Sequence, residues 1–166
     1  MKGLRLYVAS GVLAALAFLC AAYLSIPYAG GGYFNFGDIV ILLASGLLGP
    51  YAGAFVGAVG GALADLSLGM AIFSPFSLVA KGGLGFLAGL FARMIKKKEL
   101  GFLLGGFLGG SLEVLVYFLS YLVIYGTISV SSLFDCLQAY GSLIVSYPIL
   151  LLLRRALPKE WFEQKG

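Results

Sequence analysis

The sequence lacks histidine and has few cysteines and charged residues, and each shortage excludes a class of site. Without histidine, the chain cannot form a histidine-ligated metal site or a histidine-based catalytic triad. Its two cysteines, Cys20 and Cys136, do not show metal-site spacing, so we expect two free thiols in apolar surroundings. Charged residues make up 11% of the chain, against roughly 25% in a soluble domain. With 61% hydrophobic residues, this composition indicates an integral membrane protein.

The chain also lacks a P-loop, because its glycine repeats have neither the lysine nor the preceding strand that this motif needs. We therefore expect no ATP-driven activity from this chain alone. The net charge of +4 does not indicate nucleic acid, since the basic residues stand beside hydrophobic segments, as the positive-inside rule describes. The first apolar stretch, residues 6–26, exceeds the roughly 7–15 residues of a signal-peptide core, so we expect a retained helix.

Six apolar segments predict an all-α integral membrane protein with six transmembrane helices in a single domain over residues 1–166. A spanning helix needs about 20 largely apolar residues. The second segment would be only about 21 Å long at 1.5 Å per residue, less than the thickness of the hydrocarbon core. The predicted helices cover residues 4–26, 35–48, 51–68, 75–95, 100–125 and 133–153.

The positions of the basic residues predict the orientation in the membrane. An even number of helices places both termini on one side. The basic residues near segment ends all fall on that side, and the three connections on the other side contain no lysine or arginine. Since positive residues mark the cytoplasmic side, we expect both termini to be cytoplasmic. The residues on which this prediction rests are Lys2, Arg5, Arg93, Lys96, Lys97, Lys98, Arg154 and Arg155.

Glycine and alanine recur at a spacing of four along several predicted helices. Such stripes let helices approach closely in lipid. We favour packing within the chain for the glycines, with contact to another membrane subunit as the alternative. Helix 4–26 has a similar stripe that includes Gly11 and Ala15. The glycine stripes are Gly53, Gly57 and Gly61; Gly85 and Gly89; and Gly101, Gly105 and Gly109.

Lys81 is the most unusual residue, because it alone among the basic residues interrupts an apolar run, residues 73–91. A charge within a membrane is costly and usually faces the protein interior or a wet cavity. We expect an ion pair with Asp65, since their helices are antiparallel neighbours and their depths match. This pair either anchors the loop or holds Lys81 for hydrogen bonding to a ligand.

Glu113 lies midway along segment 100–125, where it is a candidate ligand acceptor, proton carrier or partner for Lys81. Tyr117, Tyr121 and Tyr125 follow at a spacing of four. An interfacial aromatic belt explains Tyr125 well and Tyr117 poorly. Together with the polar group of Gln138, these aromatic faces suit a small planar ligand.

Several short motifs follow one another in the first half of the chain: residues 33–38 (YFNFGD), 47–50 (LLGP), 53–60 (GAFVGAVG), 64–65 (AD), Pro75 and 81–82 (KG). In this order they resemble the substrate-binding S components of energy-coupling factor (ECF) vitamin transporters, in particular the riboflavin-type group. Gly11 and Ala15 occupy the places of the Ala-x-x-x-Ala motif in the first helix of that family. Asp135 and Gln138 resemble its Asn-x-x-Gln pattern, with aspartate in place of asparagine.

The resemblance implies a prokaryotic multi-pass cell-membrane protein without catalysis, cofactor or metal. Such a protein binds a small water-soluble vitamin or precursor of the riboflavin, hydroxymethylpyrimidine, pyridoxine or pantothenate class from outside. It then docks on a transmembrane coupling protein with two ATPase subunits, here through Gly11 and Ala15. We expect a pocket near the outer surface, closed by the loops after the first, third and fifth helices. The expected ligand-binding residues are Asn35, Asp38, Asp65, Lys81, Glu113, Tyr117, Tyr121 and Gln138.

The sequence also leaves two alternatives open. A proton-coupled secondary transporter would use Glu113 or Asp65 as the proton carrier, but transporters of this kind commonly contain internal repeats, and no convincing repeat relates the two halves of this sequence. An intramembrane enzyme would use Asp38, Asp65 and Glu113, because intramembrane acids mark function without specifying it.

Overall fold

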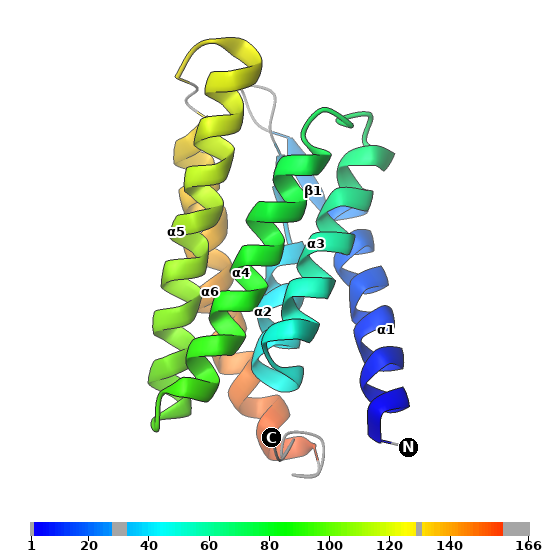
Figure 1. Cartoon of the computed structure of the whole chain (residues 1–166), viewed down its shortest axis with the longest axis vertical. Coiled ribbons are helices and arrows are strands. Elements are labelled where there is room, and N and C mark those ends of the chain that lie inside the picture. Colours follow the sequence, from blue (N-terminus) through cyan, green and yellow to red (C-terminus); the bar gives the residue numbers. More distant parts are fainter. Residues whose placement is uncertain (1, 28–32, 129–130, 158–166) are drawn as a thin grey trace.

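The computed structural model describes residues 2–27, 33–128 and 131–157, which form six helices and a short antiparallel hairpin (Figure 1). The prediction of six helices is confirmed. The elements are α1 (Lys2–Tyr23), β1 (Ser25–Pro27), β2 (Tyr33–Asn35), α2 (Gly37–Leu48), α3 (Pro50–Ser67), α4 (Ser74–Met94), α5 (Lys98–Tyr125) and α6 (Ser131–Ala156).

Four of the six helices, α1, α4, α5 and α6, are long and apolar enough to cross a membrane. The helix α3 has 18 residues and α2 only 12. At 1.5 Å per residue, α2 is about 18 Å long and cannot span the hydrocarbon core alone. The chain therefore contains four long apolar spans and two shorter helices packed among them.

Proline and glycine determine where several helices begin and end. Pro50 and Pro75 stand in the first turns of α3 and α4, where the missing N–H leaves no hydrogen bond unmade. Gly49 joins α2 to α3 with a φ of 98°, and Gly126 ends α5 with a φ of 68°. A side chain at either position would be strained, so glycine suits both turns.

The arrangement of the helices agrees with the predicted topology. The start of α1, the end of α6 and the connection from α4 to α5 lie at the lower end of the bundle in Figure 1. The hairpin and the outer ends of α3, α4 and α5 lie at the other end. Every basic cluster named above therefore belongs to segments that meet at one end, the end that the sequence predicts to be cytoplasmic.

The hairpin corrects the sequence prediction between the first two helices. The first helix ends at Tyr23 instead of residue 26, and α2 begins at Gly37 instead of residue 35. Ser25 pairs with Asn35 and Pro27 with Tyr33, where a helix end and a loop were expected. The residue before a proline is pushed towards extended conformations, which explains why the helix does not continue to Pro27. Residues 28–32 of the expected loop after the first helix lie outside the described residues.

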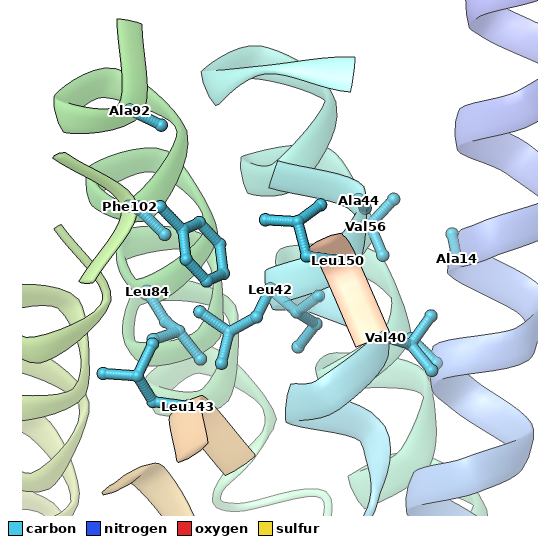
Figure 2. Packing of buried hydrophobic residues seen from close by; sticks show 13 residues of the cluster. Ala14, Val40, Leu42, Ala44, Val56, Leu84, Ala92, Phe102, Leu143 and Leu150 are labelled. Carbon is cyan, nitrogen blue, oxygen red and sulfur yellow. The ribbon is translucent and has the colours of Figure 1, made fainter. Parts of the chain in front are cut away.

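Close glycine contacts join α3, α4 and α5. A Cβ atom added to Gly57 would overlap the backbone carbonyl of Lys81, and one on Gly105 would lie 2.5 Å from the carbonyl oxygen of Leu87. Internal packing of the glycine stripes is thus confirmed. Apolar side chains, among them Leu42, Leu84 and Phe102, fill the space between α2, α4 and α5 (Figure 2).

Candidate functional site

Lys81 forms two buried ion pairs inside the bundle. Its Nζ atom lies 2.5 Å from Asp38 Oδ1 and 2.9 Å from Glu113 Oε1. The three side chains come from α4, α2 and α5, and each is at most 3% exposed. The expected position of Lys81 in the protein interior is confirmed. So is a role considered for Glu113, that of a partner for Lys81.

Two amide side chains extend this cluster towards the hairpin. Gln138 Nε2 on α6 donates to Asp38 Oδ2 at 2.6 Å. Gln138 Oε1 in turn accepts from the backbone N–H of Asn35 at 3.0 Å and from its Nδ2 at 3.3 Å. Asn35 Oδ1 accepts from the N–H of Gly37 at 2.9 Å. One polar network, which we call the Lys81 network (Asn35, Asp38, Lys81, Glu113 and Gln138), therefore connects β2, α2, α4, α5 and α6.

The short helix α2 explains how the network reaches this depth. Lys81 and Gln138 each lie seven residues from the outer end of their helix, about 10 Å below it. Asp38 pairs with Lys81 from the first turn of α2, so this helix begins well below the outer ends of α4 and α6. The carboxylate is also favoured at a helix N-terminus by the helix dipole. Extended backbone at such depth is tolerated only where protein buries it or a polar cavity adjoins it.

An apolar layer separates the network from the end of the bundle where the basic clusters lie. Leu42 follows Asp38 by one turn of α2, and Leu84 follows Lys81 by about one turn of α4, so each pair shares a helix face. Both leucines are fully buried, and Phe102 and Leu150 pack in the same cluster (Figure 2). This arrangement leaves the outer side as the direction from which a polar solute would approach the network.

Two glycines of α3 make room for the lysine. A Cβ at Gly61 would lie 2.6 Å from Lys81 Cδ, and one at Gly57 would meet the Lys81 backbone carbonyl. The glycine stripe on α3 therefore allows close helix packing and also leaves space for the methylene chain of Lys81. The sequence pattern alone does not reveal the second role, because close helix packing is sufficient to explain a glycine stripe.

Aromatic side chains lie on the outer side of the lysine. Tyr117, one turn beyond Glu113 on α5, has its ring centroid 5.7 Å from Lys81 Nζ, and its hydroxyl is 2.7 Å from Ser77 Oγ. Such a distance allows a cation–π attraction. Tyr121 is buried and packs against Phe73, with ring centroids 5.6 Å apart. Ser77 belongs to this site and was missed, because a lone serine in an apolar helix carries no sequence signal.

The expected pair between Asp65 and Lys81 is corrected by the structure. Asp65 is buried on α3, 3% exposed, but the two carboxylates that pair with Lys81 are Asp38 and Glu113. Matching depth on neighbouring helices was not sufficient, because α2 lies against both α3 and α4 and presents a closer acid. Of the eight expected ligand-binding residues, the structure joins five in the Lys81 network and places Tyr117 beside it.

The expected docking residues lie on a different surface. Gly11 and Ala15 are exposed on α1, and a Cβ added to Gly11 would meet nothing within 4 Å. The adjacent small stripe of α1 is buried and faces α3, where a Cβ on Gly60 would lie 2.9 Å from that of Ala17. The helix therefore has one small face inside the bundle and another outside it. Figure 1 shows α1 at the edge of the bundle.

The site offers one ammonium, several carboxylate and amide groups, and aromatic faces, which together suit hydrogen bonding to a small polar solute. Within the described part of the chain, no cluster of three or more His, Cys, Asp or Glu side chains is arranged to hold a metal ion. Removing one member of a buried ion pair typically costs about 3–5 kcal/mol, so the groups of the network depend on one another.

Comparisons with known proteins match most of the chain. A family model described as "ECF-type riboflavin transporter, S component" matches residues 3–155. A Pyrococcus woesei protein described as "Uncharacterized protein in gap 3'region" is 38% identical over 126 residues, which cover 75% of this chain and 84% of that protein. A solved structure of the S component of a bacterial ECF transporter superposes with a TM-score of 0.69, covering 92% of this chain and 94% of that one. At 22% identity, this likeness shows the fold.

Proposed function

Because the chain belongs to the family of ECF-type riboflavin transporter S components, we propose that it binds a small water-soluble vitamin or vitamin precursor at the Lys81 network and carries it across the membrane. The chain is a multi-pass membrane protein and a transporter component, not an enzyme. The proposed ligands are riboflavin, which the family description names, and compounds of the hydroxymethylpyrimidine, pyridoxine and pantothenate classes.

The observation that carries this proposal is the position of the Lys81 network. The five polar side chains, contributed by β2 and four helices, converge above an apolar layer and below the outer ends of α4 and α6. Tyr117 and Tyr121 lie on the outer side of Lys81, where a planar ring would pass or rest. Hydrogen-bonding residues at depth with aromatic faces above them suit the binding of a small planar solute that enters from outside.

The partners that we propose are a transmembrane coupling protein and two ATPase subunits in a prokaryotic cell membrane. Gly11 and Ala15 are exposed on a helix at the edge of the bundle, so a partner helix can approach α1 closely there. ATP hydrolysis by the partner subunits would then supply the energy for uptake.

Mass spectrometry of small molecules that co-purify with the protein tests the proposal directly. We expect one vitamin or precursor in near-stoichiometric amount after gentle purification in detergent. Lys81→Met should purify without it, whereas Lys97→Met, at an exposed residue on the cytoplasmic side, should retain it. Accumulation of a solute by the protein alone in proteoliposomes, driven by a proton gradient, would instead favour a secondary transporter.

A further inference from the structure

Acidic side chains outnumber basic ones in the interior of the bundle. Among the described residues, four carboxylates are buried together with one cation, Lys81. A surplus of buried acids is costly in a membrane unless protons or positively polarised groups neutralise it. A ligand that enters this interior is therefore favoured if it donates hydrogen bonds and is disfavoured if it is an anion. The buried carboxylates belong to Asp38, Asp65, Glu113 and Asp135.

One oxygen atom of the Lys81 network has no hydrogen-bond partner. Both oxygens of Asp38 are occupied, one by Lys81 and the other by Gln138. The amide oxygens of Gln138 and Asn35 also accept hydrogen bonds, and Glu113 Oε1 accepts from Lys81. Glu113 Oε2, by contrast, is buried and without a hydrogen-bond partner in a side chain that is only 1% exposed.

From these two observations, and resting on the proposed function, we infer that Glu113 Oε2 is the primary specificity contact and that the ligand is an amino-substituted nitrogen heteroaromatic ring. An exocyclic amino group would donate an N–H to Oε2. The ion pair with Lys81 holds Glu113 Oε1 in place and thereby orients Oε2, the oxygen that has no hydrogen-bond partner. The ring of Tyr117, one turn further out on α5, would cover the bound ring.

The same geometry disfavours other classes within the proposed range. A carboxylate ligand such as pantothenate would bring a further negative charge to an interior that already has an acidic surplus. The imide edge of a flavin presents two carbonyl oxygens beside its N–H, and these would face the Glu113 carboxylate with like polarity. Pyridoxine offers hydroxyl donors but lacks an exocyclic amino group.

A matched ligand pair provides the test. Isothermal titration of the purified full-length protein in detergent would compare amino-hydroxymethylpyrimidine with its oxo counterpart, in which a carbonyl oxygen replaces the amino group. Loss of a hydrogen bond to a charged group changes affinity by roughly 10- to 150-fold. We expect the amino compound to bind more tightly than the oxo compound by at least about tenfold.

The variant Glu113→Gln should reverse this preference, because its amide keeps the shape of the side chain and adds an N–H donor. It should weaken binding of the amino compound by at least about tenfold and leave binding of the oxo compound unchanged or improved. Glu99→Gln, at an exposed position near the cytoplasmic end of the same helix, is the matched control and should behave like the unmodified protein. If Glu113→Gln fails to fold, the ligand pair on the unmodified protein still decides the question.

The outcomes separate the two proposals. Tight binding of riboflavin that Glu113→Gln leaves unchanged would overturn the inference and leave the vitamin-binding function intact. Equal affinity for the amino and oxo compounds would also overturn it. No binding of riboflavin, hydroxymethylpyrimidine, pyridoxine or pantothenate, with no co-purified vitamin, would overturn the proposed function itself.

Discussion

Asp38 Oδ1 lies 2.5 Å from Lys81 Nζ, although 43 residues separate them in the sequence. This contact joins the start of α2, the shortest of the described helices, to the outer half of α4, and Glu113 completes it from α5. Because all three groups are buried, loss of Lys81 would leave two carboxylates in an apolar interior without their shared cation.

The first prediction follows from that dependence. Lys81→Met should lower the free energy of unfolding by about 3–5 kcal/mol, since it leaves Asp38 and Glu113 without their shared cation. Thermal unfolding in detergent, followed by circular dichroism, would show a melting temperature lower by about 10 °C. The double variant Lys81→Met with Asp38→Asn should recover part of the loss. A double variant less stable than the single one would show that the network is not held by charge.

The sequence was sufficient to predict the main features of the fold, because they depend on local signals. Helix number follows from hydropathy, and several helix ends follow from proline and glycine, as at Pro50 and Gly126. The hairpin was missed because strands of three residues are too short to show a period of two. The prediction that Lys81 lies in the protein interior was right, but the predicted ion-pair partner, Asp65, was wrong.

Which acid forms the ion pair with Lys81 depends on tertiary packing, and residue spacing in the sequence does not determine that packing. A lysine has four flexible methylene groups, so several acids lay within reach of Lys81 at the level of sequence. The depth of α2 determines which acid pairs with Lys81, because it brings Asp38 below the outer ends of the longer helices. Gln138 and Asn35 were expected in the site, but their mutual hydrogen bond could not be predicted, because it joins residues 103 positions apart.

The orientation in the membrane gives the second prediction. In a protein whose native cysteines are replaced by alanine, Ala71→Cys in the connection from α3 to α4 should react with a membrane-impermeant thiol reagent in intact cells. Lys97→Cys should react only after lysis, because the basic cluster of the connection from α4 to α5 is cytoplasmic. Labelling of Lys97→Cys but not Ala71→Cys in intact cells would invert the topology.

The glycine contacts give the third prediction. Gly57→Ala should destabilise the protein by about 1–3 kcal/mol, because the new methyl group overlaps the carbonyl of Lys81 and pushes α3 from α4. Gly141→Ala is the control, since nothing lies within 4 Å of the added Cβ on α6. That variant should be neutral or stabilised by about 0.5–1 kcal/mol through helix propensity. Equal melting temperatures for the two variants would contradict the close α3–α4 contact.

The cytoplasmic end of α2 gives the fourth prediction. Arg154 on α6 donates from Nη2 to the carbonyl oxygen of Gly46 at 2.8 Å, so a cation satisfies a free carbonyl at a helix C-terminus. Arg154→Met should cost about 1.5–3 kcal/mol of stability, the range for hydrogen bonds to charged groups. Arg155→Met, at the adjacent exposed position, should change stability by less than about 0.5 kcal/mol. Thermal unfolding of the two variants side by side measures the difference, and similar losses would assign the effect to net charge.

The exposed small face of α1 gives the fifth prediction. Gly11→Trp or Ala15→Trp should abolish uptake in cells that express the complete transporter and leave vitamin binding by the purified protein unchanged. A large side chain there does not disturb the bundle, since the space beside Gly11 is open, but it prevents a partner helix from approaching closely.

Two further tryptophan variants make that experiment specific. Val123→Trp, 73% exposed on α5, should retain uptake, which would exclude a general effect of bulk on the membrane-facing surface. Ala14→Trp, at a buried position of the same helix, should lose both binding and stability. If Gly11→Trp loses binding as Ala14→Trp does, the exposed face supports the bundle itself. If it retains full uptake, the coupling protein docks elsewhere, because close approach at Gly11 is the feature that this substitution removes.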